Sequence, residues 1–468
     1  MKPSPFTLLP LNASLLTNLA TLGYHEMTPI QANSLPYVLE GRDLIAQART
    51  GSGKTVAFGL GLLHKLDTAR PAVQALVLCP TRELADQVAG ELRRLARSEG
   101  NIRVVTLTGG TPLRPQAASL DHGAHIIVGT PGRIRDHLER GTLDLRQTHT
   151  LVLDEADRMT DMGFYDEIAG IVRACPETRQ TLLFSATYPD DIRQATRDFL
   201  HDPAEVVVET QPSDQIEQRF YEVPFGERDA AVGRLLRHFR PDSALVFCNT
   251  KAHCRGLAEA LRTQGFPALA LHGDLEQRER DEILVLFANR SCSVLVATDV
   301  AARGLDIADL GAVIIADVSR DPELHVHRVG RTGRAGASGL ALTLCAPNER
   351  KWIGLIEVYQ NAPVQWHGLD EVVTDEPQAT PAPTVTLCIL GGRKDRLRPG
   401  DVLGALTGDA GLTREQVGKI TVAQSITYVA LDRDVADQAF ERLRGEGLPA
   451  RDVATIKGRR FRTRLIKV

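Results

Sequence analysis

Short apolar segments alternate with helix-forming segments along most of this chain, and this alternation leaves few possible folds. Segments 75–80 (ALVLCP) and 125–130 (HIIVGT) are apolar throughout, which is typical of strands buried on both faces. Between such segments, 81–96 repeats leucine and valine at helical spacing. Strands that alternate with helices predict a parallel sheet covered by helices on both sides, which is an α/β fold.

The alternation occurs twice and therefore predicts two tandem domains of the same kind. The expected strands are 43–48, 75–80, 125–130, 150–157 and 181–187, and then, after a polar stretch at 209–218, 244–250, 268–273, 293–299, 312–317 and 340–346. A stretch rich in Pro and Thr at 374–384 indicates a linker. Beyond it, a β-α-β-β-α-β pattern predicts a ferredoxin-like α+β domain with the layout of an RNA-recognition motif. The expected parts are a first domain at 1–208, a second at 219–365, a linker at 366–384 and a third domain at 385–468.

The distribution of charge and cysteine narrows the class of protein. Residues 385–468 carry 16 Lys and Arg against 10 Asp and Glu, whereas the whole chain has 55 against 59. This basic tail predicts a part that binds a polyanion, although a solvated charged surface would give the same count. No apolar run reaches the length of a membrane span, and the first residues lack a signal-peptide pattern. The seven cysteines lack the paired spacing of a zinc site, so we expect buried, reduced thiols in a cytoplasmic protein with no membrane partner.

The segment 48–55 (ARTGSGKT) stands between an expected strand and an expected helix, as a phosphate-binding loop requires. Glycines let backbone N–H groups turn toward a phosphate, Lys54 adds a positive charge, and Thr55 offers a hydroxyl to Mg²⁺. The general pattern has glycine where Ala48 stands, so the match is incomplete. The residues expected to hold the nucleotide phosphates are Thr50, Gly51, Ser52, Gly53, Lys54 and Thr55.

The segment 150–157 (TLVLDEAD) ends an apolar strand in acidic residues. Asp154 at such a position can hold Mg²⁺ through water, and Glu155 can orient and deprotonate the attacking water. Alone, the same tetrapeptide would indicate a solvated helix start. Its place after a buried strand and downstream of the phosphate-binding loop favours a site for Mg²⁺.

These residues resemble the DEAD-box family of superfamily-two helicases over roughly residues 1–365. The matching segments follow in the family's order: GYHEMTPIQ (23–31), PTRELADQ (80–87), Gly109-Gly110, TPGR (130–133), SAT (185–187), QRER (277–280), ATDVAARGLD (297–306) and HRVGRTGR (327–334). Ala48 is itself the family form of the phosphate-binding loop. The resemblance implies two RecA-like domains and an ATPase stimulated by RNA.

The resemblance also implies roles for residues around the nucleotide. Gln31 would choose adenine through its amide, although in isolation it would indicate a polar cap of a helix. Arg331 and Arg334 would act as arginine fingers from the second domain, with Arg328 structural, and the SAT segment would couple domain closure to RNA. The remaining nucleotide contacts that it implies are Phe6, upstream of the glutamine segment, and Asp306 at the ribose.

RNA would be gripped through its backbone, which carries no sequence information. The contacts implied by the resemblance are Thr81, Arg82, Gly110, Thr130 and Arg133 in the first domain and Asn249, Thr250 and Thr298 in the second. A bend imposed on one strand would separate a short duplex locally, without long-range translocation. We therefore expect short duplexes to be good substrates and long ones poor.

The third domain has the layout of an RNA-recognition motif but few of its stacking aromatic residues. Tyr428 fills one such place, whereas Ile426, Leu431 and Cys388 fill others. We therefore expect RNA to bind at basic edges and loops, with Lys394, Arg459, Arg460 and Arg462 as leading candidates.

The three-domain arrangement is similar to that of the bacterial DbpA-type helicases, with VGKI (417–420) and ITYVAL (426–431) in support. This resemblance implies a structured hairpin of large-subunit ribosomal RNA as the anchor, pre-ribosomal particles as partners and a role in ribosome assembly. No feature requires more than a monomer. Two alternatives are an RNA clamp or chaperone gated by ATP, and a DNA helicase, which the glutamine segment and the third domain disfavour.

Overall fold

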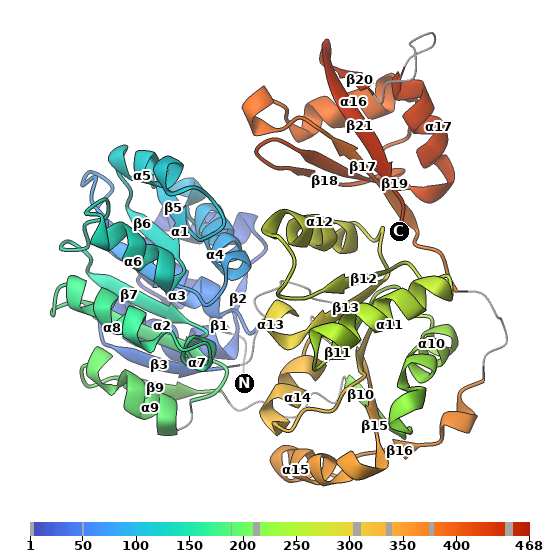
Figure 1. The fold of residues 1–468 in the computed structure, drawn as a ribbon. Helices are drawn as coiled ribbons and strands as arrows, with labels where there is room; N and C mark the ends of the chain where they lie inside the picture. Colours follow the sequence, from blue (N-terminus) through green and yellow to red (C-terminus); the bar gives the residue numbers. More distant parts are fainter. Residues whose placement is uncertain are drawn as a thin grey trace. The chain divides into compact units, whose positions relative to one another are not determined.

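The computed structural model describes residues 4–48, 51–188, 190–208, 216–302, 310–333, 339–373, 379–444 and 453–468. The described residues divide into two units, one made of those up to Val208 and the other of those from Ile216 onward (Figure 1).

The first unit contains a parallel sheet of seven strands, as the alternating pattern predicts. The strand order is β5-β6-β4-β7-β8-β3-β9. The strands are β3 (Leu44–Gln47), β4 (Ala75–Leu78), β5 (Val104–Leu107), β6 (Ile126–Gly129), β7 (Thr150–Asp154), β8 (Gln180–Ser185) and β9 (Ala204–Val207). Alternate residues of β4 enter different cores: Ala75 and Val77 pack on one face, and Leu76 and Leu78 on the other. Helices therefore cover both faces of the sheet.

Nine described helices accompany this sheet. They are α1 (Ala13–Thr21), α2 (Pro29–Glu40), α3 (Lys54–Lys65), α4 (Arg82–Leu95), α5 (Leu113–Asp121), α6 (Pro131–Glu139), α7 (Ala156–Asp161), α8 (Tyr165–Ala174) and α9 (Asp190–Thr196). Helices α1 and α2 precede the first strand of the sheet, and the others lie between its strands. The repeated apolar residues expected on one side of 81–96 are buried on α4, which confirms that prediction. A short antiparallel pair, β1 (Ser4–Pro5) with β2 (Glu26–Met27), lies outside the main sheet.

The second unit begins with another parallel sheet of seven strands, in the order β12-β13-β11-β14-β15-β10-β16. The strands are β10 (Ile216–Glu222), β11 (Ala244–Cys248), β12 (Ala268–Leu271), β13 (Val294–Thr298), β14 (Ala312–Ile315), β15 (Gly339–Cys345) and β16 (Trp366–His367). The helices are α10 (Arg228–Phe239), α11 (Lys251–Thr263), α12 (Gln277–Ala288), α13 (Asp299–Ala302), α14 (Pro322–Val329) and α15 (Arg350–Gln360). The prediction of two RecA-like parallel-sheet domains is confirmed.

The structure contains strands that the sequence did not predict, and some of them lie in stretches predicted to be linkers. β9 buries only alternate residues, so it lacks the continuous apolar run by which the central strands were found. β10 starts at Ile216, inside the stretch 209–218 that the sequence predicts to be a polar break between the domains. β16 and the buried Val372 belong to the packing of the second domain, although they fall in the predicted linker at 366–384. Short or half-exposed elements carry too few apolar residues to be recognised from the sequence.

The C-terminal part of the second unit is an antiparallel sheet in the order β18-β19-β17-β21-β20, packed on two helices (Figure 1). Its strands are β17 (Thr384–Ile389), β18 (Val417–Val422), β19 (Thr427–Asp432), β20 (Val453–Ile456) and β21 (Arg459–Ile466), and its helices are α16 (Pro399–Gly408) and α17 (Arg433–Arg444). The ferredoxin-like prediction is confirmed, with β20 as an additional strand paired to β21.

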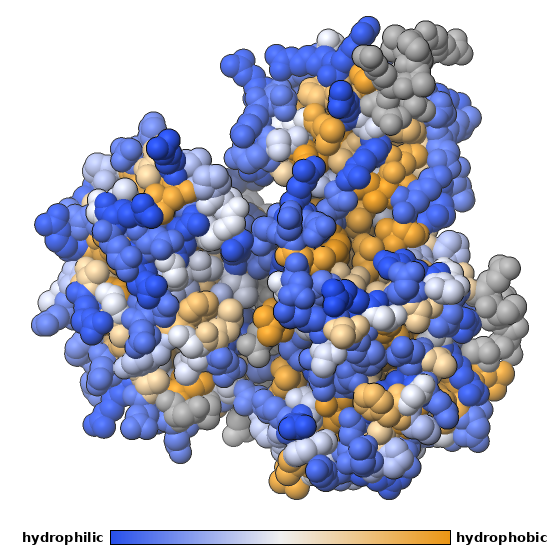
Figure 2. Space-filling view, viewed as in Figure 1, coloured by the Kyte–Doolittle hydropathy of each residue, from blue (hydrophilic) through white to orange (hydrophobic). Residues whose placement is uncertain are grey.

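Apolar side chains are mostly buried in the domain cores, and polar side chains lie mostly at the surface. Hydrophilic residues cover most of the visible surface, with smaller apolar areas between them (Figure 2). All seven cysteines are buried and unpaired, as predicted. Among the described helices, none has both the length and the apolar character needed to cross a bilayer.

Candidate nucleotide and RNA sites

The strand order of the first sheet brings the segments that resemble helicase motifs to one edge. In a parallel sheet the carboxyl ends of neighbouring strands meet at the same edge, where ligands bind. The phosphate-binding loop follows β3, the DEAD segment follows β7 and the SAT segment ends β8, and these three strands lie close together in the sheet. The segments expected to hold RNA follow β4, β5 and β6, which form the other half of the same edge. The segments expected to bind nucleotide and those expected to bind RNA thus follow strands of one sheet.

The phosphate-binding loop has the backbone that its glycines allow. Gly51 and Gly53 have φ values of 81° and 95°, a left-handed region that favours glycine. Lys54 is buried at the start of α3, and its Nζ donates to the carbonyl oxygen of Ala48 at 3.0 Å. The Ser52 hydroxyl is buried and has no hydrogen-bond partner within the protein. A buried ammonium group and an unsatisfied hydroxyl are suited to a bound phosphate group.

Gln31 ties the glutamine segment to this loop. Its Oε1 accepts from the backbone N–H of Thr28 at 2.9 Å, and its Nε2 donates to the carbonyl oxygen of Gly53 at 3.1 Å. The amide therefore caps the start of α2, the alternative that the sequence left open, while it also contacts the phosphate-binding loop. A Cβ atom at Gly53 would lie 2.4 Å from the Gln31 amide nitrogen, so Gly53 is fixed both by its φ value and by this contact.

Phe6, the nucleotide contact expected upstream of the glutamine segment, lies in the core of the first domain. Its side chain is only 3% exposed and packs in the main core cluster with Leu11 and Leu15. In this conformation Phe6 anchors the N-terminal segment to the domain. Three other predicted nucleotide contacts, Thr50, Asp306 and Arg334, lie outside the described residues.

Asp154 and Glu155 stand at the carboxyl end of β7, as predicted. Asp154 is buried, and this burial raises its pKa to about 7, with Lys54 opposing the shift and Glu155 adding to it. Glu155 has a φ of 55° and pairs with Arg158 at 3.1 Å. A buried carboxylate that is costly to ionise, together with the hydroxyl of Thr55, is a donor set that suits Mg²⁺, which prefers oxygen ligands. Bound there, Mg²⁺ would supply charge neutralisation for nucleotide phosphates.

Asp157, the last residue of the DEAD segment, has a role that the sequence analysis missed. Its Oδ2 accepts from the backbone N–H groups of Ala186 and Thr187, both at 3.2 Å, and from the Thr187 hydroxyl at 3.3 Å. The backbone N–H of Asp157 in turn donates to Ser185 Oγ at 3.2 Å. The DEAD and SAT segments are thus held together by one carboxylate. The adjacent strands β7 and β8 bring them together, and the sequence alone does not reveal that pairing.

The predicted RNA contacts of the first domain lie where helices begin. Thr81 caps α4, accepting from the backbone N–H of Leu84 at 3.2 Å, and Thr130 occupies the same position before α6. Helix starts present free N–H groups that suit phosphates. Gly110 has a φ of 75° in the turn after β5, and a Cβ on its neighbour Gly109 would lie 2.8 Å from the Arg82 guanidinium. The expected RNA-binding residues thus lie at two helix starts and one turn, which follow the neighbouring strands β4, β6 and β5.

The guanidinium of Arg133, an expected RNA contact, is already bonded within the first domain. One guanidinium nitrogen donates to the carbonyl oxygen of Thr111 at 2.9 Å and to Gln116 Oε1 at 3.0 Å, and the side chain is 13% exposed. In this conformation Arg133 supports the turn after β5. A phosphate contact by its guanidinium would require these bonds to be exchanged.

The second domain places its predicted residues in the same way. Asn249 and Thr250 follow β11, and Thr250 caps α11 by accepting from the backbone N–H of His253 at 3.1 Å. Thr298 ends β13, the neighbour of β11. Arg331 follows α14 and is 6% exposed. Arg328 is buried and bonded to Asp299 at 2.7 and 2.6 Å, which agrees with the structural role expected for it.

The sheet face of the C-terminal domain is covered by the second RecA-like domain. Tyr428, Cys388 and Arg464 form one row across β19, β17 and β21. Tyr428 donates its hydroxyl hydrogen to Glu282 of α12 at 3.3 Å, and Arg464 pairs with the same carboxylate at 2.7 Å. Tyr428 is consequently 6% exposed, and the row that would stack bases is occupied by a protein contact.

The basic clusters of the C-terminal domain are exposed and adjoin one another. Arg459 donates to the carbonyl oxygen of Asp395 at 2.9 Å, which brings the β20–β21 hairpin next to the loop that contains Lys394. Arg460 and Arg462 are exposed along β21, and Lys394 is exposed in the loop. Figure 2 shows hydrophilic side chains at the end of the domain where Figure 1 labels α16 and β20. Two separate basic segments of the sequence therefore form one surface.

Comparisons with known proteins agree with this geometry. Family models match for the DEAD/DEAH box helicase over residues 28–195, the helicase conserved C-terminal domain over 227–336 and the DbpA RNA binding domain over 386–464. The chain is 51% identical to the ATP-dependent RNA helicase DbpA of Escherichia coli strain K12, over 97% of both chains. It is 46% identical to the DEAD-box ATP-dependent RNA helicase CshA of Bacillus cereus, over 75% of this chain and 67% of that one.

Solved structures of the same kind are also similar. Dbp5 of S. cerevisiae bound to RNA and ADP BeF3 matches with a TM-score of 0.73 at 29% identity, over 79% of this chain and 96% of that one. Mss116p bound to single-stranded RNA and AMP-PNP matches with a TM-score of 0.69 at 26% identity, over 78% and 81%. The chain belongs to the DbpA-type DEAD-box ATP-dependent RNA helicases.

Proposed function

We propose that this protein hydrolyses ATP when it binds RNA and uses the reaction to separate short duplexes near an anchor in large-subunit ribosomal RNA. The observation that carries the proposal is the shared edge of the first sheet. The phosphate-binding loop, the DEAD segment and the predicted RNA contacts all end strands of that sheet, and Asp157 bonds the catalytic segment to SAT. A change at the nucleotide can thereby reach the RNA through short, rigid elements.

In the proposed reaction, Lys54 and the N–H groups of the loop bind the phosphates of ATP. Thr55 and Asp154 would hold Mg²⁺, and Glu155 would take the proton of the attacking water. By family resemblance, Arg331 and Arg334 would stabilise the charge that develops on the γ-phosphoryl oxygens, and Gln31, Phe6 and Asp306 would contact the base and ribose. The backbone-binding residues would bend one RNA strand, so that only a few base pairs are separated in each cycle.

The C-terminal domain would supply the anchor. The matching DbpA RNA binding domain and the exposed surface of Lys394, Arg459, Arg460 and Arg462 support this assignment. Since the sheet face is occupied by Glu282 of α12, we place the RNA on this basic surface. The proposed partners are large-subunit ribosomal RNA and pre-ribosomal particles, with the protein acting as a monomer in the cytoplasm.

ATPase assays with ribosomal RNA, homopolymer RNA and DNA test the proposal. We expect strong stimulation by ribosomal RNA, weaker stimulation by homopolymer RNA and none by DNA. Equal stimulation by DNA would contradict an RNA helicase with a specific anchor. A labelled short duplex distinguishes unwinding from the alternative of an ATP-gated clamp, because a clamp would bind the duplex and hydrolyse ATP without releasing a strand.

A triple substitution tests the anchor surface. Replacing Arg459, Arg460 and Arg462 by Ala should weaken binding of ribosomal RNA by about tenfold or more at physiological salt and reduce its salt dependence, because fewer counterions are released. Stimulation by saturating homopolymer RNA should change little. Arg414→Ala, an exposed arginine before β18, is the matched control. Unchanged affinity in the triple variant would refute the placement of the anchor.

A further inference from the structure

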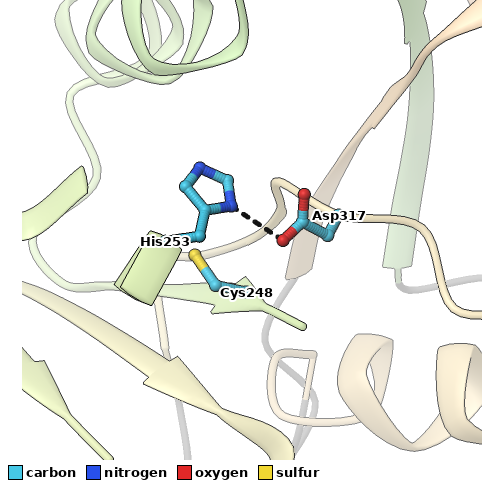
Figure 3. A group of neighbouring side chains, drawn as sticks. All are labelled: Cys248, His253 and Asp317. Atoms are coloured by element: carbon cyan, nitrogen blue, oxygen red, sulfur yellow. Dashed lines mark hydrogen bonds and ion pairs between the residues drawn. The ribbon is translucent and has the colours of Figure 1, made fainter. Parts of the chain in front are cut away.

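A group of ionisable side chains lies at the carboxyl edge of the second sheet, where no role has yet been given to it. Cys248 ends β11, His253 is in α11 and Asp317 follows β14 (Figure 3). A thiol, an imidazole and a carboxylate so close together could hold a metal ion. The hydrogen bonds of His253 argue for a different function.

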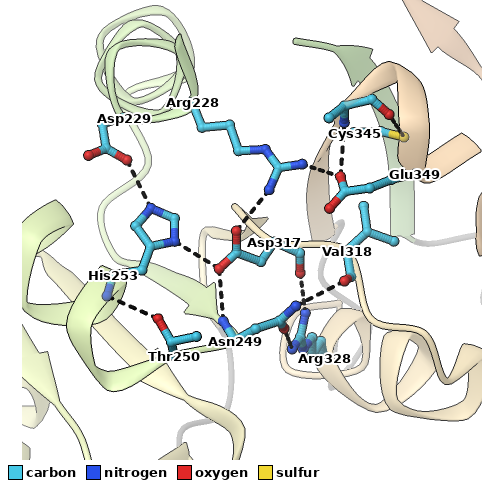
Figure 4. A network of polar contacts seen from close by, with 11 residues as sticks. Arg228, Asp229, Asn249, Thr250, His253, Asp317, Val318, Arg328, Cys345 and Glu349 are labelled. Atoms are coloured by element: carbon cyan, nitrogen blue, oxygen red, sulfur yellow. Dashed lines mark hydrogen bonds and ion pairs between the residues drawn. The ribbon is translucent and has the colours of Figure 1, made fainter. Parts of the chain in front are cut away.

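His253 is clamped between two carboxylates. Its Nδ1 lies 2.8 Å from Asp317 Oδ2, and its Nε2 lies 2.9 Å from Asp229 Oδ1 on α10 (Figure 4). The hydrogen bond to Asp317 is the main cause that raises the pKa of His253 to about 11, and the bond to Asp229 adds to it. Both ring nitrogens therefore carry a proton at neutral pH, and an imidazolium has no lone pair to offer to a metal.

Asp317 is the centre of the network. Its Oδ2 also accepts from the backbone N–H of Asn249 at 2.9 Å, and its Oδ1 accepts from the buried Arg228 at 2.9 Å. Burial alone would raise the pKa of Asp317, but the bonds from His253 and Asn249 outweigh it and lower the pKa. Its backbone carbonyl oxygen accepts from Arg328 at 2.6 Å (Figure 4). One aspartate thus contacts α10, α11 and α14.

Asn249 is oriented by the same network on both sides. Its backbone N–H is held by Asp317, its Nδ2 donates to the carbonyl oxygen of Val318 at 3.1 Å, and its Oδ1 accepts from Arg328 at 2.8 Å. Arg328 in turn belongs to α14, the helix that leads directly to Arg331. The residue predicted to touch RNA and the helix before a predicted arginine finger are therefore joined through the buried side chains of Asp317 and Arg328.

We infer that His253, acting through Asp317, is a positioning residue that holds Asn249 and Arg328 in the arrangement needed for an RNA strand to be bound. The inference rests on the proposed function, in which Asn249 contacts the RNA backbone. The start of α11 does not need the charged bridge, because Thr250 already caps that helix. What the bridge adds is a fixed position for the backbone and amide of Asn249.

A double-mutant cycle in RNA affinity tests the inference, with the full-length protein, a non-hydrolysable ATP analogue and labelled single-stranded RNA. We expect His253→Gln to weaken RNA binding about fivefold. The change removes the charged hydrogen bond to Asp317, the residue that holds the backbone of Asn249. Asn249→Ala should weaken RNA binding as well, and the double variant should be no weaker than Asn249→Ala. In His253→Gln, the KM for ATP in the absence of RNA should equal that of the wild type. His238→Gln, an exposed histidine on α10, is the matched control.

Additive losses in the double variant, or full RNA affinity in His253→Gln, would overturn the inference. If His253→Gln does not fold, as thermal unfolding would reveal, Asp229→Asn removes only the half-exposed outer partner and should give a smaller loss that also disappears in the Asn249→Ala background. Additive losses there would overturn the inference equally. A wild-type protein that binds RNA but does not unwind a duplex would count against the proposed function alone, because this cycle reads binding only.

Discussion

Lys54, Asp154 and Glu155 are ionisable side chains that the first domain buries at the carboxyl edge of its sheet. Burying a charge is costly unless it is compensated, and here the raised pKa of Asp154 records the cost. Lys54 opposes that shift, and Arg158 pairs with Glu155. These charge partners within the protein hold the side chains in place, which is the arrangement expected of a preorganised catalytic site.

Glu155→Gln tests the assignment of the base. The amide keeps the size of the side chain but cannot take a proton, so kcat for ATP hydrolysis should fall by about 10²- to 10⁴-fold. Binding of ATP and RNA should be retained, as measured by equilibrium binding of labelled ligands. Glu139→Gln, an exposed glutamate on α6, should leave hydrolysis unchanged. Turnover that survives in Glu155→Gln would show that another group activates the water.

His253 makes the stability of its domain depend on pH. Its folded pKa of about 11 exceeds the ordinary value of 6.5, so the folded state binds the proton more tightly than the unfolded state. The stabilisation is complete below about pH 6.5 and is lost progressively as the pH rises toward 11. The lowered pKa of Asp317 lies below 3.8 and does not titrate in this window. Between pH 6.5 and 9, the Tm advantage of the wild type over His253→Gln should shrink; an advantage that grows would contradict this protonation state.

At the scale of elements, the carboxyl edge of each parallel sheet determines which loops can cooperate. The strands β7 and β8 are neighbours, so the turn into α7 and the SAT segment meet, and Asp157 joins them. A carboxylate that accepts several backbone N–H groups holds a loop more firmly than neutral acceptors can. The Asp157 carboxylate therefore joins the DEAD segment directly to the SAT segment.

Asp157→Asn weakens that connection without removing the side chain. Since a neutral amide oxygen accepts less strongly than a carboxylate, we expect unwinding of a short duplex to fall about tenfold, with a smaller loss of ATP hydrolysis. Asp198→Asn, an exposed aspartate after α9, is the control. Equal loss of hydrolysis and unwinding would indicate that Asp157 supports catalysis itself and not its transmission to RNA.

The central elements could be predicted from the sequence, whereas the contacts between elements could not. Buried strands such as β4 and β7 carry continuous apolar runs, and the catalytic-type residues follow them directly. The bonds of Asp157 to the SAT segment and of Arg133 to the turn after β5 depend on strand order, which the runs do not specify. Gln31 illustrates the same limit, because its amide bridges two segments that only the folded chain brings together.

At the scale of the whole molecule, the C-terminal domain is more than an appended RNA-binding module. Asn289 and Ser291, which follow α12, bond the Thr386 hydroxyl at 3.1 and 2.7 Å. Glu282 of α12 meets Tyr428 and Arg464 on the same sheet face. The second RecA-like domain is therefore docked on the face that other RNA-recognition motifs use for stacking. RNA bound at the basic surface of the C-terminal domain would therefore remain attached, through that domain, to the second RecA-like domain during each ATP cycle.

Glu282→Gln tests this docking through the reactivity of Cys388. The thiol lies between Tyr428 and Arg464 in the covered row and is fully buried. Losing the charge of Glu282 should loosen the contact and raise the rate of Cys388 alkylation by about threefold, a small effect because Arg464 is half exposed and its pair is screened by solvent. Alkylation is read at the Cys388 peptide by mass spectrometry, and Glu259→Gln on α11 serves as the control. The rate should also rise with salt in the wild type and not in Glu282→Gln. If Cys388 in the wild type reacts as fast as in urea-unfolded protein, the sheet face is open in solution, and RNA could then stack on Tyr428 after all.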